Sequence, residues 1–383
     1  MSSERVWFST TYFLYFAALS AIVPFIALYY QSLGLTGGQV GMLLGVPPLV
    51  TLFALPFWTG LADARNRHKL TLVVTIAMAV FLMAIFPAIR KFALALPFII
   101  GFAFFSAPIM ALVDTAILSK LGSQRDMYGR VRLWGTVGWG LGAPIAGGIL
   151  QRYGLPCMFW MYAGLMALSL ISIQKLDFIR SAAVTPFWKG VRTILTNRHW
   201  ALFMVMVFIS AIGFSAHTSY LSILLETMGA SKTLMGIAVT ISIISELPVM
   251  FFSSLLLRKF RARGLLAVAM TVAGLRCILY YFSGSPQIVL VIQLLHGLTF
   301  PALWIAGVTY AAENAPPGLG ATAQGLFGGV LLGFGAAAGS LLGGVLIDRL
   351  GVAGMYGTVG IIVLSGLVLM FVNEGNQTPQ ADL

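Results

Sequence analysis

Long apolar runs separated by short polar turns recur along the whole chain. Residues 240–257, for example, read TISIISELPVMFFSSLLL, with a single carboxylate, Glu246, near the middle. A run of about 20 apolar residues crosses the hydrocarbon core as an α-helix, whereas a β-barrel strand needs only about 10 alternating residues. Only 9% of the residues are charged and 59% are hydrophobic, whereas soluble domains carry about 25% charged residues. The sequence therefore predicts an all-α integral membrane protein.

Twelve transmembrane helices are predicted from these runs. The first run starts at Val6 and continues to about Tyr30, which is too long for the apolar core of a signal peptide. The expected helices span residues 7–31, 38–60, 70–89, 93–118, 130–151, 157–174, 200–226, 233–256, 265–283, 288–311, 318–346 and 352–372.

Basic residues are distributed unevenly between the two sets of turns. With the N-terminus inside, most of the 23 lysines and arginines fall on the cytoplasmic side, while the outer turns keep only a few, such as Arg90 and Lys91. The positive-inside rule then places both termini in the cytoplasm. We expect a multi-pass protein of a bacterial inner membrane. The net charge of +12 is explained by this topology, so we expect a lipid bilayer and no nucleic acid as partner.

The chain repeats itself at an offset of about 195 to 197 residues. Gly34 and Gly41 recur as Gly229 and Gly236, and the glycine pair 147–148 recurs as 343–344. A constant offset across six helices predicts two parallel six-helix repeats, an architecture typical of transporters with a binding site near the midplane. We expect an N-terminal bundle at 1–174, a cytoplasmic linker at 175–199 and a C-terminal bundle with a short cytoplasmic tail at 200–383.

The turn TGLADARNRHKL at residues 59–70 carries the first recognisable motif. It resembles the loop signature of the major facilitator superfamily, which Asp63, Arg67 and Lys69 match, while Asn66 stands where the pattern has a glycine. Asn tolerates the left-handed conformation that this position needs. The resemblance implies that Asp63 and Arg67 latch helix ends on the cytoplasmic side; the alternative is an ordinary basic loop.

Further motifs narrow the resemblance within this superfamily. The segments VDTAILSKL, YGRVRLWGTVGW, SAHTSY, SELPVMFF and HGLTF are together similar to the phenylpropionate permease type of proton symporter, which is related to the lactose and nucleoside permeases. The resemblance implies import of a small organic solute with protons. We expect alternating access between the two six-helix halves and a monomeric protein. An aromatic carboxylate is one possible substrate.

Three ionisable residues are expected at one depth in the second half. Glu246, Arg276 and His296 lie within roughly 5 Å of the midpoints of three successive helices, at 1.5 Å per residue. Burial favours the neutral form of a carboxyl group and a nearby cation favours the ionised form, which suits Glu246 to bind and release a proton. Arg276 would hold the charge of Glu246 or of an anionic substrate. The competing interpretation is a structural ion pair between Glu246 and Arg276 with His296 as a packing residue.

A second group of charges is predicted nearer the cytoplasm. Asp114 and Arg132, on adjacent helices, are expected to form a salt bridge that is structural, gates the cytoplasmic side or contacts substrate. The candidate cavity-lining residues are polar or aromatic, and each of them could equally serve packing: His217, Tyr220, Gln293, Trp304, Tyr12, Tyr15 and Trp134.

The glycine pattern of the fifth predicted helix is compatible with a second function. Gly138, Gly142, Pro144, Gly147 and Gly148 resemble the glycine-proline signature of drug/proton antiporters, although small residues four apart also serve close helix packing. Efflux by antiport is thus the first alternative, and a transporter-like receptor or scaffold is the second. No phosphate-binding loop, nucleophile elbow or histidine metal pair is present, so we expect no enzyme and no metal or other cofactor.

Overall fold

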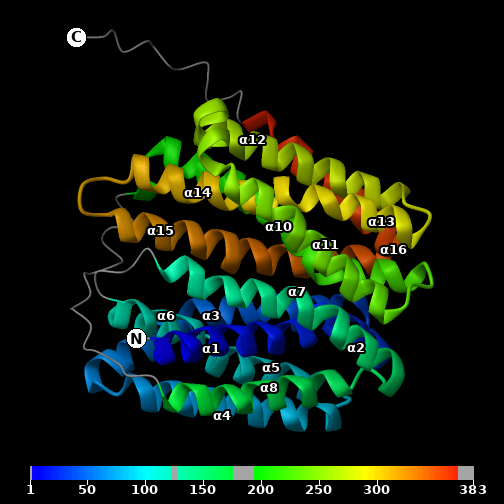
Figure 1. Cartoon of the computed structure of the whole chain (residues 1–383). Helices are drawn as coiled ribbons and strands as arrows, with labels where there is room; N and C mark the ends of the chain where they lie inside the picture. The colour runs from blue at the N-terminus through cyan, green and yellow to red at the C-terminus, as the bar shows by residue number, and fades with distance from the viewer. Residues whose placement is uncertain (1, 122–126, 176–193, 370–383) are drawn as a thin grey trace. The chain divides into compact units, whose positions relative to one another are not determined.

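The computed structural model describes residues 2–121, 127–175 and 194–369, which contain helices and no strand. Residue packing divides the chain into two compact units. The first comprises described residues of 1–184 together with Ser219–Ile243, and the second comprises those of 185–218 and 244–383. Figure 1 shows the long helices of each unit running side by side.

The first unit is built from the helices of the N-terminal half and the ends of two later ones. Its elements are α1 (Ser2–Ile22), α2 (Ile26–Ser32), α3 (Gly37–Arg65), α4 (His68–Ile85), η1 (Phe86–Ala88), α5 (Phe92–Ser106), α6 (Ile109–Leu121), α7 (Tyr128–Tyr153) and α8 (Cys157–Gln174). To these the unit adds the C-terminal part of α10 (Arg198–Thr227) and the N-terminal part of α11 (Lys232–Phe251).

The second unit contains the rest of α10 and α11 and the remaining helices. These are α12 (Ser253–Phe282), α13 (Pro286–Gln293), η3 (Leu294–Leu298), α14 (Phe300–Asn314), α15 (Gly320–Gly328), η4 (Gly329–Gly335) and α16 (Ala336–Gly366). Gly274 of α12 and Gly360 of α16 bring these two helices together, because a Cβ on Gly360 would lie 2.9 Å from the carbonyl oxygen of Gly274. Only small residues allow such close contact between helix backbones.

Glycines also set the packing of α7 in the first unit. A Cβ on Gly138 would collide with the carbonyl oxygen of Phe13, and one on Gly142 with the hydroxyl of Ser20, both on α1. Gly147 meets the backbone of Lys232 in the same way, and Gly236 meets the backbone of Ala143. The hydroxyl of Thr240 donates a hydrogen bond of 2.7 Å to the carbonyl of Gly140. The small residues of α7 therefore serve close contacts with α1 and α11.

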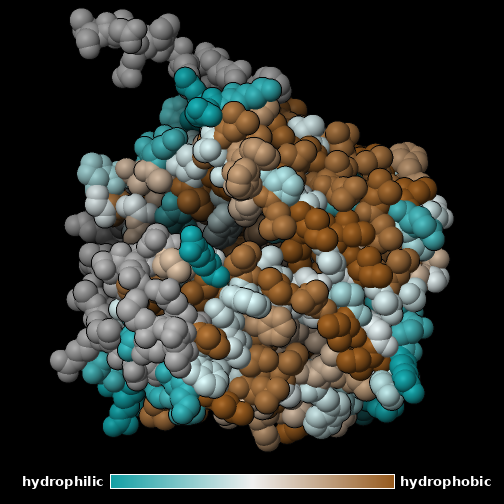
Figure 2. Space-filling model, in the orientation of Figure 1, coloured by the Kyte–Doolittle hydropathy of each residue, from teal (hydrophilic) through white to brown (hydrophobic). Residues whose placement is uncertain are grey.

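Eleven helices among the described residues are long and apolar enough to cross a membrane. Large apolar side chains such as Phe53, Ile145 and Ile361 are 60% to 70% exposed, and brown, apolar residues cover much of the surface seen in Figure 2. Side chains of this kind suit contact with lipid, which has no polar partner to offer. This confirms an all-helical, multi-pass membrane protein.

Several expected boundaries fall differently in the structure, and two of these differences lie in the second half of the chain. The helices expected at 318–346 and 352–372 form one span of 47 residues, Gly320–Gly366, whose helical conformation is interrupted at Gly351 (φ 71°, ψ 172°). The helix expected to end near residue 256 ends at Phe251, and α12 starts at Ser253 and is interrupted at Arg261 (φ 53°, ψ 174°). The count of twelve spans remains a prediction.

The turn between α3 and α4 has the conformation expected of Asn66. This residue lies in the left-handed region (φ 50°, ψ 41°) and caps α3. The ring Nε2 of His68 donates to the carboxylate of Asp63 at 2.8 Å, and the Nζ of Lys69 donates to the carbonyl of Gln174 at 2.6 Å. Arg67 is the N-cap residue of α4. The turn thus ties the ends of α3, α4 and α8 together.

Candidate functional site

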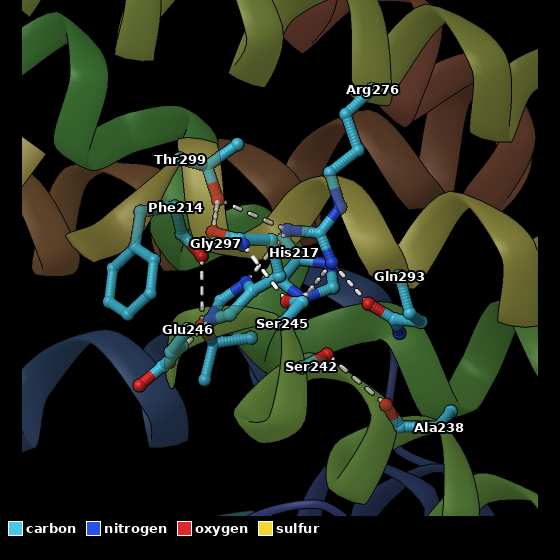
Figure 3. Close-up of polar contacts among 12 residues, drawn as sticks. Phe214, His217, Ala238, Ser242, Ser245, Glu246, Arg276, Gln293, Gly297 and Thr299 are labelled. Carbon is cyan, nitrogen blue, oxygen red and sulfur yellow. Dashed lines mark hydrogen bonds and ion pairs between the residues drawn. The ribbon is translucent and has the colours of Figure 1, made fainter. Parts of the chain in front are cut away.

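The second unit holds a buried polar cluster centred on Arg276 of α12. Arg276 is only 3% exposed, and the close-up in Figure 3 shows its side chain reaching toward His217, Gln293 and Thr299. These partners come from α10, from the end of α13 and from the residue between η3 and α14. The cluster therefore draws on four segments of one unit.

Every N–H of the Arg276 guanidinium has an acceptor. The Nε donates to the hydroxyl of Tyr280 (2.8 Å), and Nη1 donates to the Nδ1 of His296 (2.8 Å) and to the hydroxyl of Thr299 (3.3 Å). Nη2 donates to the Nε2 of His217 (3.0 Å) and to the amide oxygen of Gln293. A guanidinium has five N–H groups, so in this conformation none is left for a substrate.

Glu246 reaches this arginine only through His296. One carboxylate oxygen of Glu246 lies 3.0 Å from the Nε2 of His296, whose Nδ1 receives the Arg276 hydrogen bond. Because arginine can only donate, Nδ1 must be the unprotonated nitrogen of the ring. His296 is then the neutral Nε2–H tautomer and donates to the Glu246 carboxylate. The direct Glu246–Arg276 contact considered from the sequence is thus replaced by a chain of three side chains.

Local backbone structure explains how His296 reaches this position. Pro301 lies in the first turn of α14, where a missing N–H costs no hydrogen bond and where proline favours the start of a helix. The span 286–314 is accordingly interrupted, and Thr299 (φ −99°, ψ −86°) separates η3 from α14. The hydroxyl of Thr299 donates to the carbonyl of His296 at 2.7 Å. This interruption turns the imidazole toward α11 and α12.

Gly297 sets the distance between η3 and α11. A Cβ at this position would collide with the carbonyl oxygen of Ser245, and the Gly297 N–H donates to the Ser245 hydroxyl at 3.0 Å. His296 and Glu246 are the immediate chain neighbours of these two residues. The backbone contact between Gly297 and Ser245 therefore keeps the imidazole of His296 within hydrogen-bonding distance of the Glu246 carboxylate.

The space beside Arg276 is too small for an organic solute. A cavity of about 20 Å³ is lined by residues that include His217, Arg276 and Thr299, which is enough room for about one water molecule. Glu246 is the more accessible end of the chain of side chains, because its side chain is 23% exposed and that of His296 is 9% exposed. Among the residues of the described cluster, Glu246 therefore has the most accessible ionisable group.

The first unit holds the second predicted group of charges. The hydroxyl of Tyr12 donates to the carboxylate of Asp114, and Tyr128 lies edge-on to Tyr12 at 6.5 Å between ring centroids. The guanidinium of Arg132 lies over the ring of Phe16 at 4.2 Å and over that of Tyr12 at 5.3 Å. Within the described residues Arg132 has no hydrogen bond or ion pair, so Tyr12 occupies the place on Asp114 that we expected Arg132 to take.

The remaining predicted residues are spread over both units. Trp134, which is 49% exposed, lines a pocket of about 400 Å³ together with Val6, Ser9, Thr10 and Phe13 of α1. Tyr15 lies edge-on to Phe16, Tyr220 is fully buried in the first unit, and Trp304 contacts the rings of Phe300 and Phe327. His217 and Gln293 instead belong to the Arg276 cluster.

Two cluster residues were not singled out as site residues from the sequence. Tyr280 lies one helical turn after Arg276, at the i+4 spacing that places two side chains on one helix face. This spacing is enough to predict that the two side chains are neighbours. The hydroxyl of Thr299 accepts a hydrogen bond from Arg276, a contact that no spacing in the sequence indicates. Glu246 is the only carboxylate among the hydrogen-bonded residues of the described cluster.

Helices that cross the membrane many times around buried charged clusters define a polytopic membrane transporter. The chain belongs to the MFS_1 like family, whose model matches residues 5–357.

Several characterised and uncharacterised transporters resemble the chain over most of its length. An uncharacterised transporter of Bacillus subtilis, YwbF, is 27% identical over 94% of this chain and 90% of its own length. A maltose permease of Geobacillus stearothermophilus is 24% identical over 98% of this chain and 96% of its own. A probable 3-phenylpropionic acid transporter of Escherichia coli is 24% identical over 80% and 82%.

A solved structure agrees with the fold. The crystal structure of the nucleoside transporter NupG superimposes with a TM-score of 0.85 over 97% of this chain and 98% of that one, at 16% sequence identity. At this identity the likeness establishes the major facilitator fold alone.

Proposed function

We propose that this protein is a proton-coupled symporter that imports a small organic solute by alternating access. In this proposal the chain crosses the membrane twelve times, as two parallel six-helix halves at 1–174 and 200–383 with a cytoplasmic linker at 175–199. It works as a monomer in a bacterial inner membrane with both termini in the cytoplasm. The observation that carries the proposal is the Glu246–His296–Arg276 chain of hydrogen bonds.

The proton would bind to Glu246. With the carboxylate ionised, the chain of three residues is neutral overall, because a neutral His296 connects one negative and one positive charge. Protonation of Glu246 removes the countercharge of Arg276, whose own proton is never released. The protonated state therefore carries one net positive charge within the membrane, which is costly unless another negative charge approaches. This gives a physical reason for the proton and an anionic solute to bind together.

Within the first unit, Arg132 is a separate candidate to bind the carboxylate of an anionic solute. Arg276 has no N–H left to donate, whereas Arg132 has no hydrogen bond among the described residues, packs against two aromatic faces and interacts with Asp114 through its charge alone. Phe16 lies one helical turn from Phe13, which lines the pocket of about 400 Å³ with Trp134. A pocket of this size with aromatic walls suits a small organic molecule. An aromatic carboxylate, as in the name of the Escherichia coli relative, would use both the rings and the guanidinium.

Efflux by proton antiport is the second candidate function. The observation that favours it is the glycine pattern of α7, although Gly138, Gly142 and Gly147 each have a packing contact that explains them. Antiport would use the same proton site in the opposite direction relative to the solute.

Flux measurements in energy-depleted vesicles distinguish these functions. Aromatic acids, nucleosides and sugars are added in turn, and external pH is followed. Alkalinisation that accompanies entry of one of them supports symport. Efflux of solute driven by an inward proton gradient would replace symport by antiport, and absence of flux with every compound would contradict both.

The role of Glu246 is tested by Glu246→Gln, with Glu226→Gln as the matched control on an exposed residue. The glutamine can still accept a hydrogen bond from His296 but cannot bind a proton, so uphill uptake should be lost while solute exchange is retained in part. The control should transport normally. Uphill uptake that persists in Glu246→Gln would exclude this residue as the coupling group.

A further inference from the structure

The connection between α11 and α12 is a short basic helix that is too far from the membrane centre to be part of either span. α11 has 20 residues, or roughly 30 Å at 1.5 Å per residue, which matches the hydrocarbon core. The part of α12 after the interruption at Arg261, residues 262–282, is similarly about 30 Å long. Residues 252–261, here called the connector, therefore lie at the level of the lipid headgroups.

The connector combines exposed cations with exposed apolar side chains. Arg258, Lys259 and Arg261 are all exposed. Phe252 and Leu255 are each 51% exposed. A short segment with this composition lies in the membrane interface, with its apolar groups among the acyl chains and its cations among the headgroups.

These cations have no acidic partner. Within the part of the chain that the structure describes, none of the three forms an ion pair or a hydrogen bond, and only Lys259 has a neighbour of note, the ring of Phe260 at 5.4 Å. Arg263, just beyond the connector, lies over the ring of Tyr310 at 5.7 Å. The connector thus presents three positive charges that no described residue of its own unit neutralises.

Arg261 adopts a backbone conformation that arginine avoids. Its φ of 53° and ψ of 174° lie in a region used essentially by glycine alone. The interruption of α16 has nearly the same conformation, and there the residue is Gly351 (φ 71°, ψ 172°). A charged side chain at a position where glycine would remove the strain indicates that the side chain itself is used.

We propose that the connector binds the headgroup of an anionic phospholipid, with Arg258, Lys259 and Arg261 contacting the phosphodiester. Each basic residue near an anionic membrane surface contributes about fivefold in affinity. The exposed Phe252 and Leu255 keep the connector at the depth of the phosphate. The occupant is a bilayer lipid because these apolar side chains are exposed beside the cations, an arrangement that a free anion would not use.

The test compares lipid selectivity of the purified full-length protein. Protein in mixed phosphatidylcholine and phosphatidylglycerol vesicles is extracted, and the retained lipids are measured by mass spectrometry. Arg258→Gln with Lys259→Gln should lower phosphatidylglycerol selectivity by roughly 25-fold, at about fivefold per charge. The matched control is Arg90→Gln with Lys91→Gln, two exposed cations in another turn, which should leave selectivity unchanged. Equal loss in both double variants, or loss in neither, would overturn the proposal.

Arg261→Gly provides an independent test of the same site. This variant is expected to fold, because glycine readily adopts the backbone conformation found at this position. Glycine relieves the backbone strain, so the Tm in phosphatidylcholine should rise, while phosphatidylglycerol selectivity should fall about fivefold. Unchanged selectivity would remove Arg261 from the site.

Inorganic phosphate is added as competitor in a final arm. Displacement of the lipid by phosphate alone would show a simple anion site and contradict the assignment to a membrane lipid. None of these readouts depends on transport.

Discussion

At the scale of single residues, His296 has the most specific role, because one of its nitrogens is assigned by its neighbour. Arg276 must donate to Nδ1, so only Nε2 carries a hydrogen and donates to Glu246. His296 then acts as a neutral connector, and protonating it would remove the acceptor for Arg276. This separates two hypotheses, one in which His296 carries the proton and one in which it positions Glu246.

Two substitutions of His296 separate these hypotheses. The amide of a glutamine reaches about as far as Nε2 and can still donate to Glu246, whereas an asparagine ends near Nδ1. His296→Gln should keep uphill uptake within roughly tenfold of the wild type, and His296→Asn should lose more, because one hydrogen bond to a charged group contributes about 1.5 to 3 kcal/mol. The measurement is solute accumulation under an imposed pH gradient. Equal and complete loss in both variants would indicate that His296 itself carries the proton.

At the scale of helices and turns, glycine contacts decide how closely the elements approach. Gly274 and Gly360 join α12 to α16, Gly138 joins α7 to α1, and Gly297 joins η3 to α11. The last contact matters most for function, since Glu246 and His296 are chain neighbours of the two residues that touch. The proposed proton site thus depends on a backbone contact as well as on side chains.

Gly297→Ala should separate η3 from α11 and weaken proton coupling. The added methyl group collides with the carbonyl of Ser245, so we expect a loss of about 1 to 3 kcal/mol in stability together with reduced uphill uptake. The control is Gly328→Ala in α15, where a Cβ meets nothing within 4 Å and alanine favours the helix by about 0.5 to 1 kcal/mol. Thermal unfolding in detergent and uptake in vesicles measure the two effects. Full coupling in Gly297→Ala would contradict the positioning role of this contact.

At the scale of the whole molecule, the number of spans decides the topology. The last apolar span, Gly320–Gly366, has 47 residues and would be roughly 70 Å long if straight, more than twice the thickness of the hydrocarbon core. It is interrupted at Gly351, beside the exposed Arg349. Two crossings that turn near Gly351 give the proposed total of twelve.

Single cysteines test this topology in a variant with Cys157 and Cys277 replaced by serine. A cysteine at Arg349 should react with a membrane-impermeant maleimide added outside intact cells. A cysteine at Arg258 should react only after the cells are opened. Protection of the Arg349 position in intact cells together with labelling after lysis would place this turn in the cytoplasm and rule out the proposed topology.

The sequence by itself determined the class of fold and the family, and it predicted a common level for the buried charges of the second half. Apolar runs of about 20 residues with few charges predict transmembrane helices, because a helix satisfies every backbone polar group within its own segment. The loop around Asn66 and the predicted common depth of Glu246, Arg276 and His296 both come from residue spacing. The conformation of Asn66 was predicted correctly because it depends on local backbone preferences.

Only the tertiary structure decided which of these groups touch. Depth along a helix is readable from residue number, whereas contact also depends on helix rotation and on interruptions such as those at Thr299 and Arg261. For that reason His296 lies between Glu246 and Arg276, and Tyr12, not Arg132, contacts Asp114. The sequence shows which residues of the predicted spans are charged. Packing between segments that are distant in the sequence determines which partner each of them contacts.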